Sequence, residues 1–79
     1  MKGGKKSMKF KVFKGAFPDV IEEVVSEFET FDLYQALLHL EEEGYMVDPV
    51  HLIRTTVIDG YEYVDFGDWI YFLCFKQAQ

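Results

Sequence analysis

Residues 17–28, which read FPDVIEEVVSEF, decide the fold of this 79-residue chain, because they can form either a helix or a strand. Asp19 and Glu22 have the spacing of a helix capping box just after Pro18. The apolar residues between Val20 and Phe28 also recur at helical spacing. Most of them are β-branched, however, and β-branched side chains favour strands. We predict a helix here, with a strand as the alternative.

A second helix is predicted directly after this stretch. Thr30 can cap its start, and Gly44 can end it as a left-handed residue, with Tyr45 folding back onto Leu40. The apolar stripe of this helix has five members: Leu33, Tyr34, Leu37, Leu38 and Leu40.

Strands are predicted on both sides of the two helices. Residues 8–14 alternate as a half-buried strand does, and their lysines suit an exposed edge. Residues 51–58 and 61–64 flank an Asp-Gly pair, which is a strong hairpin signal. Residues 69–76 are apolar on both faces, as in a central or an interface strand. The predicted fold is α+β, a small antiparallel sheet in β-α-α-β-β-β order with two helices packed on one face.

The order of two helices and a hairpin looks like the layout of winged-helix domains. The resemblance covers roughly residues 18 to 75, in pattern only, and includes the Leu-rich stretch ALLHLEEEGY at residues 36–45. It implies a winged-helix-like variant of the predicted fold, with the second helix in the recognition position. The polar face of that helix is acidic, whereas helices that read DNA carry Arg and Lys.

Charge divides the chain unevenly. Six of the eight basic residues lie in the first 14 positions, and all 14 acidic residues follow them. From residue 15 onward the only bases are Arg54 and Lys76, so that part carries 2 − 14 = −12. We interpret residues 1–7 as a basic flexible arm or an expression remnant, and residues 8–79 as one domain. The lone cysteine and the lack of a long apolar run predict a cytoplasmic protein outside the membrane.

The acidic residues predict a surface for a basic protein partner, one version being a protein that mimics nucleic acid. Glu41, Glu42 and Glu43 end the second helix, where negative charge opposes the helix dipole. Four more acidic residues recur at every third position through the turns: Asp59, Glu62, Asp65 and Asp68. The alternatives are a solvated helix end and a calcium site in the turns, although the spacing is not that of an EF-hand.

Aromatic residues are concentrated near the C-terminus, with seven between residues 61 and 75. A small sheet covered on one face cannot bury all of them, and large apolar patches are unusual on monomers. We predict that four of them form a homodimer contact: Tyr61, Tyr63, Trp69 and Tyr71. The alternative is that they are core residues or are exposed singly.

We recognise no catalytic pair, no metal-ligand set and no cofactor motif in the sequence. His39, His51 and Cys74 have no partners at the spacing of a metal or catalytic site. The sequence therefore predicts a small acidic, non-enzymatic binding protein without a cofactor. The alternative is a nucleic-acid-binding module, in which the N-terminal lysines contact phosphates and exposed aromatic rings stack on bases. A small enzyme is the least favoured class.

Overall fold

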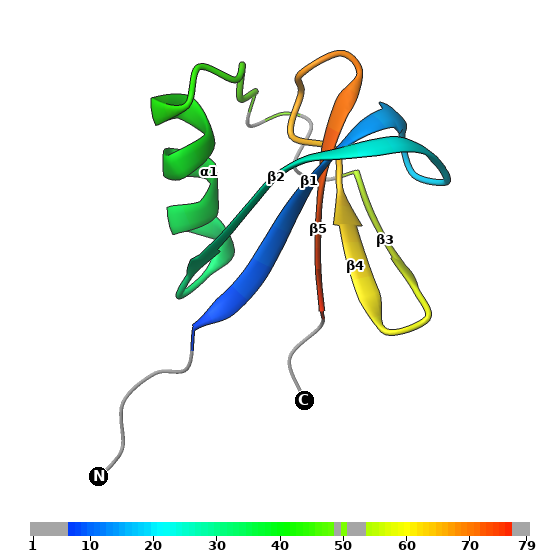
Figure 1. Cartoon of the computed structure of the whole chain (residues 1–79), viewed down its shortest axis with the longest axis horizontal. Coiled ribbons are helices and arrows are strands. Elements are labelled where there is room, and N and C mark those ends of the chain that lie inside the picture. The colour runs from blue at the N-terminus through cyan, green and yellow to red at the C-terminus, as the bar shows by residue number, and fades with distance from the viewer. Residues whose placement is uncertain (1–6, 49, 51–53, 77–79) are drawn as a thin grey trace, which may run out of the picture.

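The computed structural model describes residues 7–48, 50 and 54–76, which form one helix and a five-stranded antiparallel sheet (Figure 1). The elements in chain order are β1 (Met8–Ala16), β2 (Val20–Thr30), α1 (Leu33–Glu42), β3 (Thr55–Ile58), β4 (Tyr61–Val64) and β5 (Tyr71–Lys76). The strands lie in the order β2-β1-β5-β4-β3. The described chain is therefore mostly β. The predicted α+β fold with two helices is wrong, and so is its winged-helix-like variant.

The stretch from residue 20 to residue 28 is a strand and not the predicted helix. It belongs to β2, which pairs with β1 from Met8 opposite Thr30 to Ala16 opposite Val20. Four β-branched residues fit this pleated, paired surface better than a helix. Asp19 and its neighbours form the turn of the hairpin. Asp is common in turns as well as at helix caps, which is why this residue type also suggests a helix.

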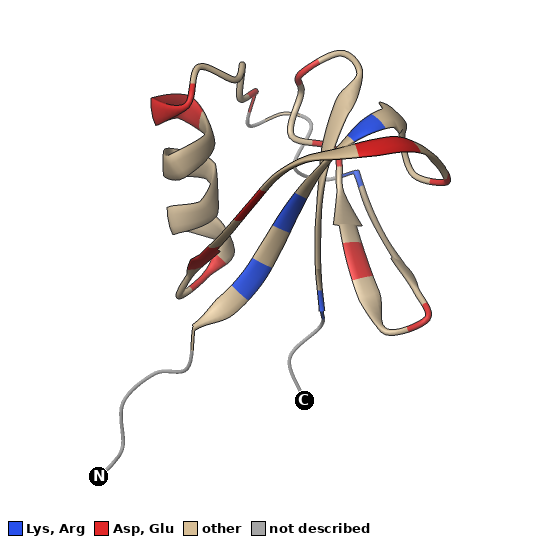
Figure 2. Cartoon of the chain, viewed as in Figure 1, with Lys and Arg blue, Asp and Glu red and all other residues tan. Residues whose placement is uncertain are grey.

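β1 is an inner strand, between β2 and β5, and not the predicted exposed edge. Each of its three lysines stands opposite a glutamate of β2 in the strand register: Lys9 and Glu29, Lys11 and Glu27, Lys14 and Glu23. Opposite charges directly across a strand pair contribute roughly 0.2–1 kcal/mol each. The basic first strand is thus matched by the acidic second strand (Figure 2), which accounts for part of the charge asymmetry of the sequence.

The hydrophobic core occupies both faces of the sheet. The larger cluster lies between α1 and one face, and its buried members are Phe10, Val12, Ala36, Leu37, Leu40, Val64, Phe66, Leu73 and Phe75. The smaller cluster consists of Phe13, Phe72 and Cys74, with Phe17 and Tyr63 packed against it. Successive residues of a strand point to opposite faces, so β5 contributes to both clusters. The prediction of a central last strand is confirmed by this position.

The predicted start of α1 is wrong, and its predicted end is confirmed. Asp32 and not Thr30 is the N-cap, since its carboxylate accepts a hydrogen bond from a backbone N–H at 2.9 Å. At the other end Gly44 has φ +100, and the N–H of Tyr45 donates to the carbonyl of Leu40 at 2.9 Å. This is the predicted left-handed end of a helix.

The hairpin predicted at Asp59 and Gly60 joins β3 to β4. Their φ values are +53 and +83, as a two-residue hairpin turn of this kind requires. The predicted strand over 51–58 is seen as β3, and residues 51–53 lie outside the described part of the chain, as do residues 1–6 of the predicted arm. Within the described residues, no helix is long and apolar enough to cross a membrane.

Candidate protein-interaction surface

Two loops that are distant in sequence lie together at one end of the sheet. They are the loop that follows α1 and the loop between β4 and β5. The N–H of Asp48 donates to the carbonyl of Phe66 at 2.8 Å, and the N–H of Met46 donates to the carboxylate of Asp68 at 2.7 Å. Gly67 is required at the crossing, because a Cβ there would stand 2.7 Å from the Cβ of Asp48. These contacts hold both loops in one surface.

A hollow of about 340 Å³ opens beside these loops, and we call it the Trp69 hollow. It is lined by Met46, Arg54, Asp65, Gly67 and Trp69. Nη1 of Arg54 lies 2.9 Å from Oδ2 of Asp65, so an ion pair forms part of its wall. The other oxygen of Asp65 accepts the N–H of Gly67 at 3.0 Å, which orders the start of the loop.

Trp69 stands at the rim of this hollow and is 90% exposed, more than any other large apolar side chain in the described ranges. Its φ is +35, in the left-handed region that costs a residue other than glycine roughly 1–2 kcal/mol. The N–H of Tyr71 donates to the carbonyl of Asp68 at 2.7 Å and closes the turn around Trp69. An exposed indole on a strained backbone gains little from packing within the chain, and such strain is concentrated at binding sites.

A cluster of three aromatic rings packs beneath the surface of the two loops. The ring of Tyr45 meets Phe66 and Tyr71 edge to face, at centroid distances of 6.0 and 5.3 Å. Burial, followed by the nearby Tyr71, Glu43 and Asp68, raises the pKa of Tyr45 above its ordinary value of 10.0. Tyr45 therefore stays neutral at physiological pH, and two carboxylates lie close enough to act on its hydroxyl.

The predicted acidic residues occupy three separate places (Figure 2). Three are exposed around the end of α1, namely Glu41, Glu42 and Glu43. Asp65 and Asp68 belong to the loop beside Trp69. Asp59 and Glu62 lie at the β3–β4 hairpin, at the other end of β4. The structure therefore joins Asp65 and Asp68 to the Trp69 hollow and does not gather all seven residues on one face.

The four aromatic residues predicted to form a homodimer contact are also separated. Tyr61 and Trp69 are exposed, at opposite ends of the β4 strand and its following loop. Tyr63 packs against the smaller cluster, with its ring 6.2 Å from that of Phe13, and Tyr71 packs against the larger cluster. They do not share one surface.

Met46 and Arg54 are the members of the hollow that sequence reasoning does not find. Met46 is exposed after the helix end, and Arg54 precedes β3, where its guanidinium also lies 5.4 Å from the ring of Phe17. Neither residue has a local motif. The only available signal is that Arg54 is one of two bases after residue 15.

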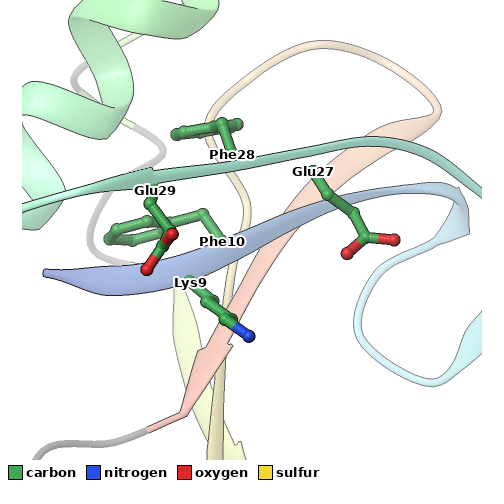
Figure 3. Close-up of a pocket in the computed structure, with 5 residues that line it drawn as sticks. All are labelled: Lys9, Phe10, Glu27, Phe28 and Glu29. Atoms are coloured by element: carbon green, nitrogen blue, oxygen red, sulfur yellow. The ribbon is translucent and has the colours of Figure 1, made fainter.

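A second hollow, of about 250 Å³, lies on the β1–β2 hairpin and bears on the nucleic-acid alternative. Figure 3 shows the residues that line it: Lys9, Glu27 and Glu29, with Phe10 and Phe28 beside them. The oxygen Oε2 of Glu29 also accepts a hydrogen bond from Ser7 at 3.0 Å. The hollow has one lysine and two glutamates in its lining, and the two negative charges make it poorly suited to hold phosphate.

The described parts of the chain contain no group of three or more His, Cys, Asp or Glu side chains that could hold a metal ion. The ring of His39 stacks on Phe28 at 4.1 Å, and Cys74 is buried in the smaller cluster. Burial raises the pKa of the Cys74 thiol above its ordinary value of 9.0, which disfavours the reactive thiolate. Comparison of the chain with protein-family models, curated proteins and solved structures found no match.

Proposed function

We propose that this protein is a small non-enzymatic binding protein that engages a basic protein partner, with Trp69 as the anchor of the contact. The observation that supports this most is the 90% exposed indole, held at φ +35 on the rim of a hollow. Trp, Met and Arg are enriched at protein interfaces, and all three line this hollow. Covering the indole by a partner removes a large apolar area from water, which offsets the backbone strain.

The distribution of charge supports a basic partner. Residues 7–30 contain three lysines and five acidic residues, so their net charge is 3 − 5 = −2. In residues 31–79 two bases accompany nine acidic residues, a sum of 2 − 9 = −7. The acidic excess thus belongs to the part that contains α1 and the Trp69 loops, and such a field attracts basic molecules. A Lys or Arg of the partner can also lie over the Trp69 ring in a cation–π contact.

Three other readings have less support. Nucleic-acid binding would need the lysines of β1 to contact phosphates, but each of them stands opposite a glutamate. Mimicry of nucleic acid needs a regular row of carboxylates, whereas the seven predicted ones lie in three places. Homodimerisation through Tyr61, Tyr63, Trp69 and Tyr71 needs a shared surface, which these residues do not form.

Affinity capture from the source cell, with mass spectrometry of the retained proteins, tests the proposal. The bait is compared with Trp69→Gly and with Tyr34→Ala, a control at a 70% exposed aromatic residue on α1. We expect a basic protein that the wild type and Tyr34→Ala retain and Trp69→Gly loses. Equal retention by Trp69→Gly, or retention of acidic proteins only, contradicts the proposal.

A further inference from the structure

β2 is an edge strand with an open side. It lies at one end of the strand order, and no strand of the described chain pairs with its outer side. Its first six residues, 20–25, are all exposed, whereas the later ones alternate with half-buried positions. One of these is Phe28, which stacks on His39 of α1. The open stretch is therefore six residues long, which is a common length for a strand in a sheet.

The side chains of this stretch are unusually apolar for an exposed edge. Four of the six are exposed β-branched residues: Val20 at 51%, Ile21 at 47%, Val24 at 43% and Val25 at 36%. Natural edges resist pairing by being short, by carrying charged residues or Pro, or by having bulges. β2 has 11 residues and no Lys or Pro, and all its charges are glutamates, which repel an acidic segment but not a basic one. Two register irregularities against β1 fall within this stretch, at Val25 and Glu22, and they twist the strand, so the edge suits a short added segment and not a long one.

The charge of β2 identifies what can pair with it. The strand contains Glu22, Glu23, Glu27 and Glu29 and no basic residue. The lysines of β1 stand opposite three of these glutamates on the paired side. A carboxylate has two oxygens and can accept hydrogen bonds from both sides. Within residues 20–25, an added strand with Lys or Arg would meet Glu22, which has no register partner in β1, and at Glu23 it would complete a row of basic, acidic and basic side chains across three strands.

A second copy of β2 fits this edge poorly. An antiparallel register centred between Val24 and Val25 would match the exposed valines of the two copies. The same register sets Glu22 of each copy opposite Glu27 of the other, because 22 + 27 equals 24 + 25. Like charges directly opposite each other destabilise a strand pair.

We propose that residues 20–25 of β2 are a docking site for an extended basic segment of a partner protein, which adds to the sheet as a further strand. Backbone hydrogen bonds along the open edge supply affinity, as in other cases of strand addition. Lys or Arg of the segment meets Glu22 and Glu23, and its β-branched residues cover the exposed valines. This site shares no residue with the lining of the Trp69 hollow, so either can exist without the other.

The test uses a short synthetic peptide in which Lys and Val alternate, added to the full chain labelled with ¹⁵N. We expect backbone amides of residues 20–25 to shift and to exchange more slowly with solvent. Glu22→Gln with Glu23→Gln should weaken binding roughly 2- to 30-fold, as expected for the loss of two exposed charge pairs. The matched control, Glu41→Gln with Glu42→Gln, makes the same change in charge at the end of α1 and should leave the affinity nearly unchanged.

Two control peptides decide the mode of binding. A peptide with Glu in place of Lys should not bind, and one with N-methylated backbone amides should bind far more weakly. Equal binding of either peptide overturns the proposal, as does a response confined to the loops around Trp69. The proposal is also overturned if, without peptide, the amides of residues 20–25 exchange more slowly as the protein concentration rises. The edge is then occupied by a second copy of the chain.

Discussion

Replacing Trp69 with glycine separates the cost of its backbone conformation from the value of its side chain. Trp69 has φ +35, and glycine at this position removes a backbone strain of roughly 1–2 kcal/mol. Glycine also makes the unfolded chain more flexible, which costs about 0.4–1 kcal/mol. Little packing is lost, since Trp69 is 90% exposed. We therefore expect Trp69→Gly to be about 0–1.6 kcal/mol more stable than Trp69→Ala, which keeps the strain.

The assay is urea unfolding followed by far-ultraviolet circular dichroism, because the variants lack the fluorophore. The free energy of unfolding is compared among wild type, Trp69→Ala and Trp69→Gly. A protein that becomes no less stable without Trp69 keeps this residue for something other than folding. Loss of roughly 3–5 kcal/mol in both variants, the cost expected for a buried tryptophan, would refute this reasoning.

Three further predictions concern stability and association. Gly15→Ala should destabilise the protein by about 1–3 kcal/mol or more in urea unfolding, because its Cβ would stand 1.9 Å from the carbonyl oxygen of Val20; an unchanged midpoint would contradict this close approach. The free energy of unfolding should fall as the pH rises through 9.0, since the Cys74 thiol ionises in the unfolded chain while burial keeps it protonated in the folded one, and Cys74→Ala should flatten that fall. Neutralising Glu41, Glu42 and Glu43 to Gln should slow association with the basic partner and lower its salt sensitivity in stopped-flow measurements, while stability stays equal or rises by a few tenths of a kcal/mol as the helix-dipole penalty is relieved.

Local signals predict this fold well where a few neighbouring residues determine the backbone. Gly44 ends the helix, and Asp59 with Gly60 forms the hairpin, because positive φ angles favour these residue types. The apolar run of β5 indicates a strand covered on both faces. Each of these signals depends on chemistry within a few positions, so a single sequence contains it.

The stretch 20–28 shows where local reasoning fails. Its apolar residues satisfy the spacing of a helix, and its β-branched residues satisfy the preference for a strand. The outcome depends on pairing with β1, whose lysines lie opposite the glutamates of β2. That pairing is a tertiary contact, and tertiary context overrides local propensity.

The interaction surface is predictable only in part for the same reason. Trp69, Asp65 and Asp68 stand out by residue type and by position in a turn-rich segment. Met46 joins them through a hydrogen bond to Asp68 across 22 positions of sequence. No periodicity or motif announces a contact of this range.

The fluorescence of Trp69 tests most sharply whether this residue anchors a basic partner. Trp69 is the only tryptophan in the chain. It is therefore the single reporter of the complex when the partner has no tryptophan, or when the tryptophans of the partner are replaced with a non-fluorescent analogue. In the free protein we expect long-wavelength emission that acrylamide quenches readily. When the captured partner is added, we expect the emission to shift to shorter wavelength and the indole to be strongly protected from acrylamide. Unchanged emission and quenching in a complex shown by sedimentation to be saturated would contradict this expectation.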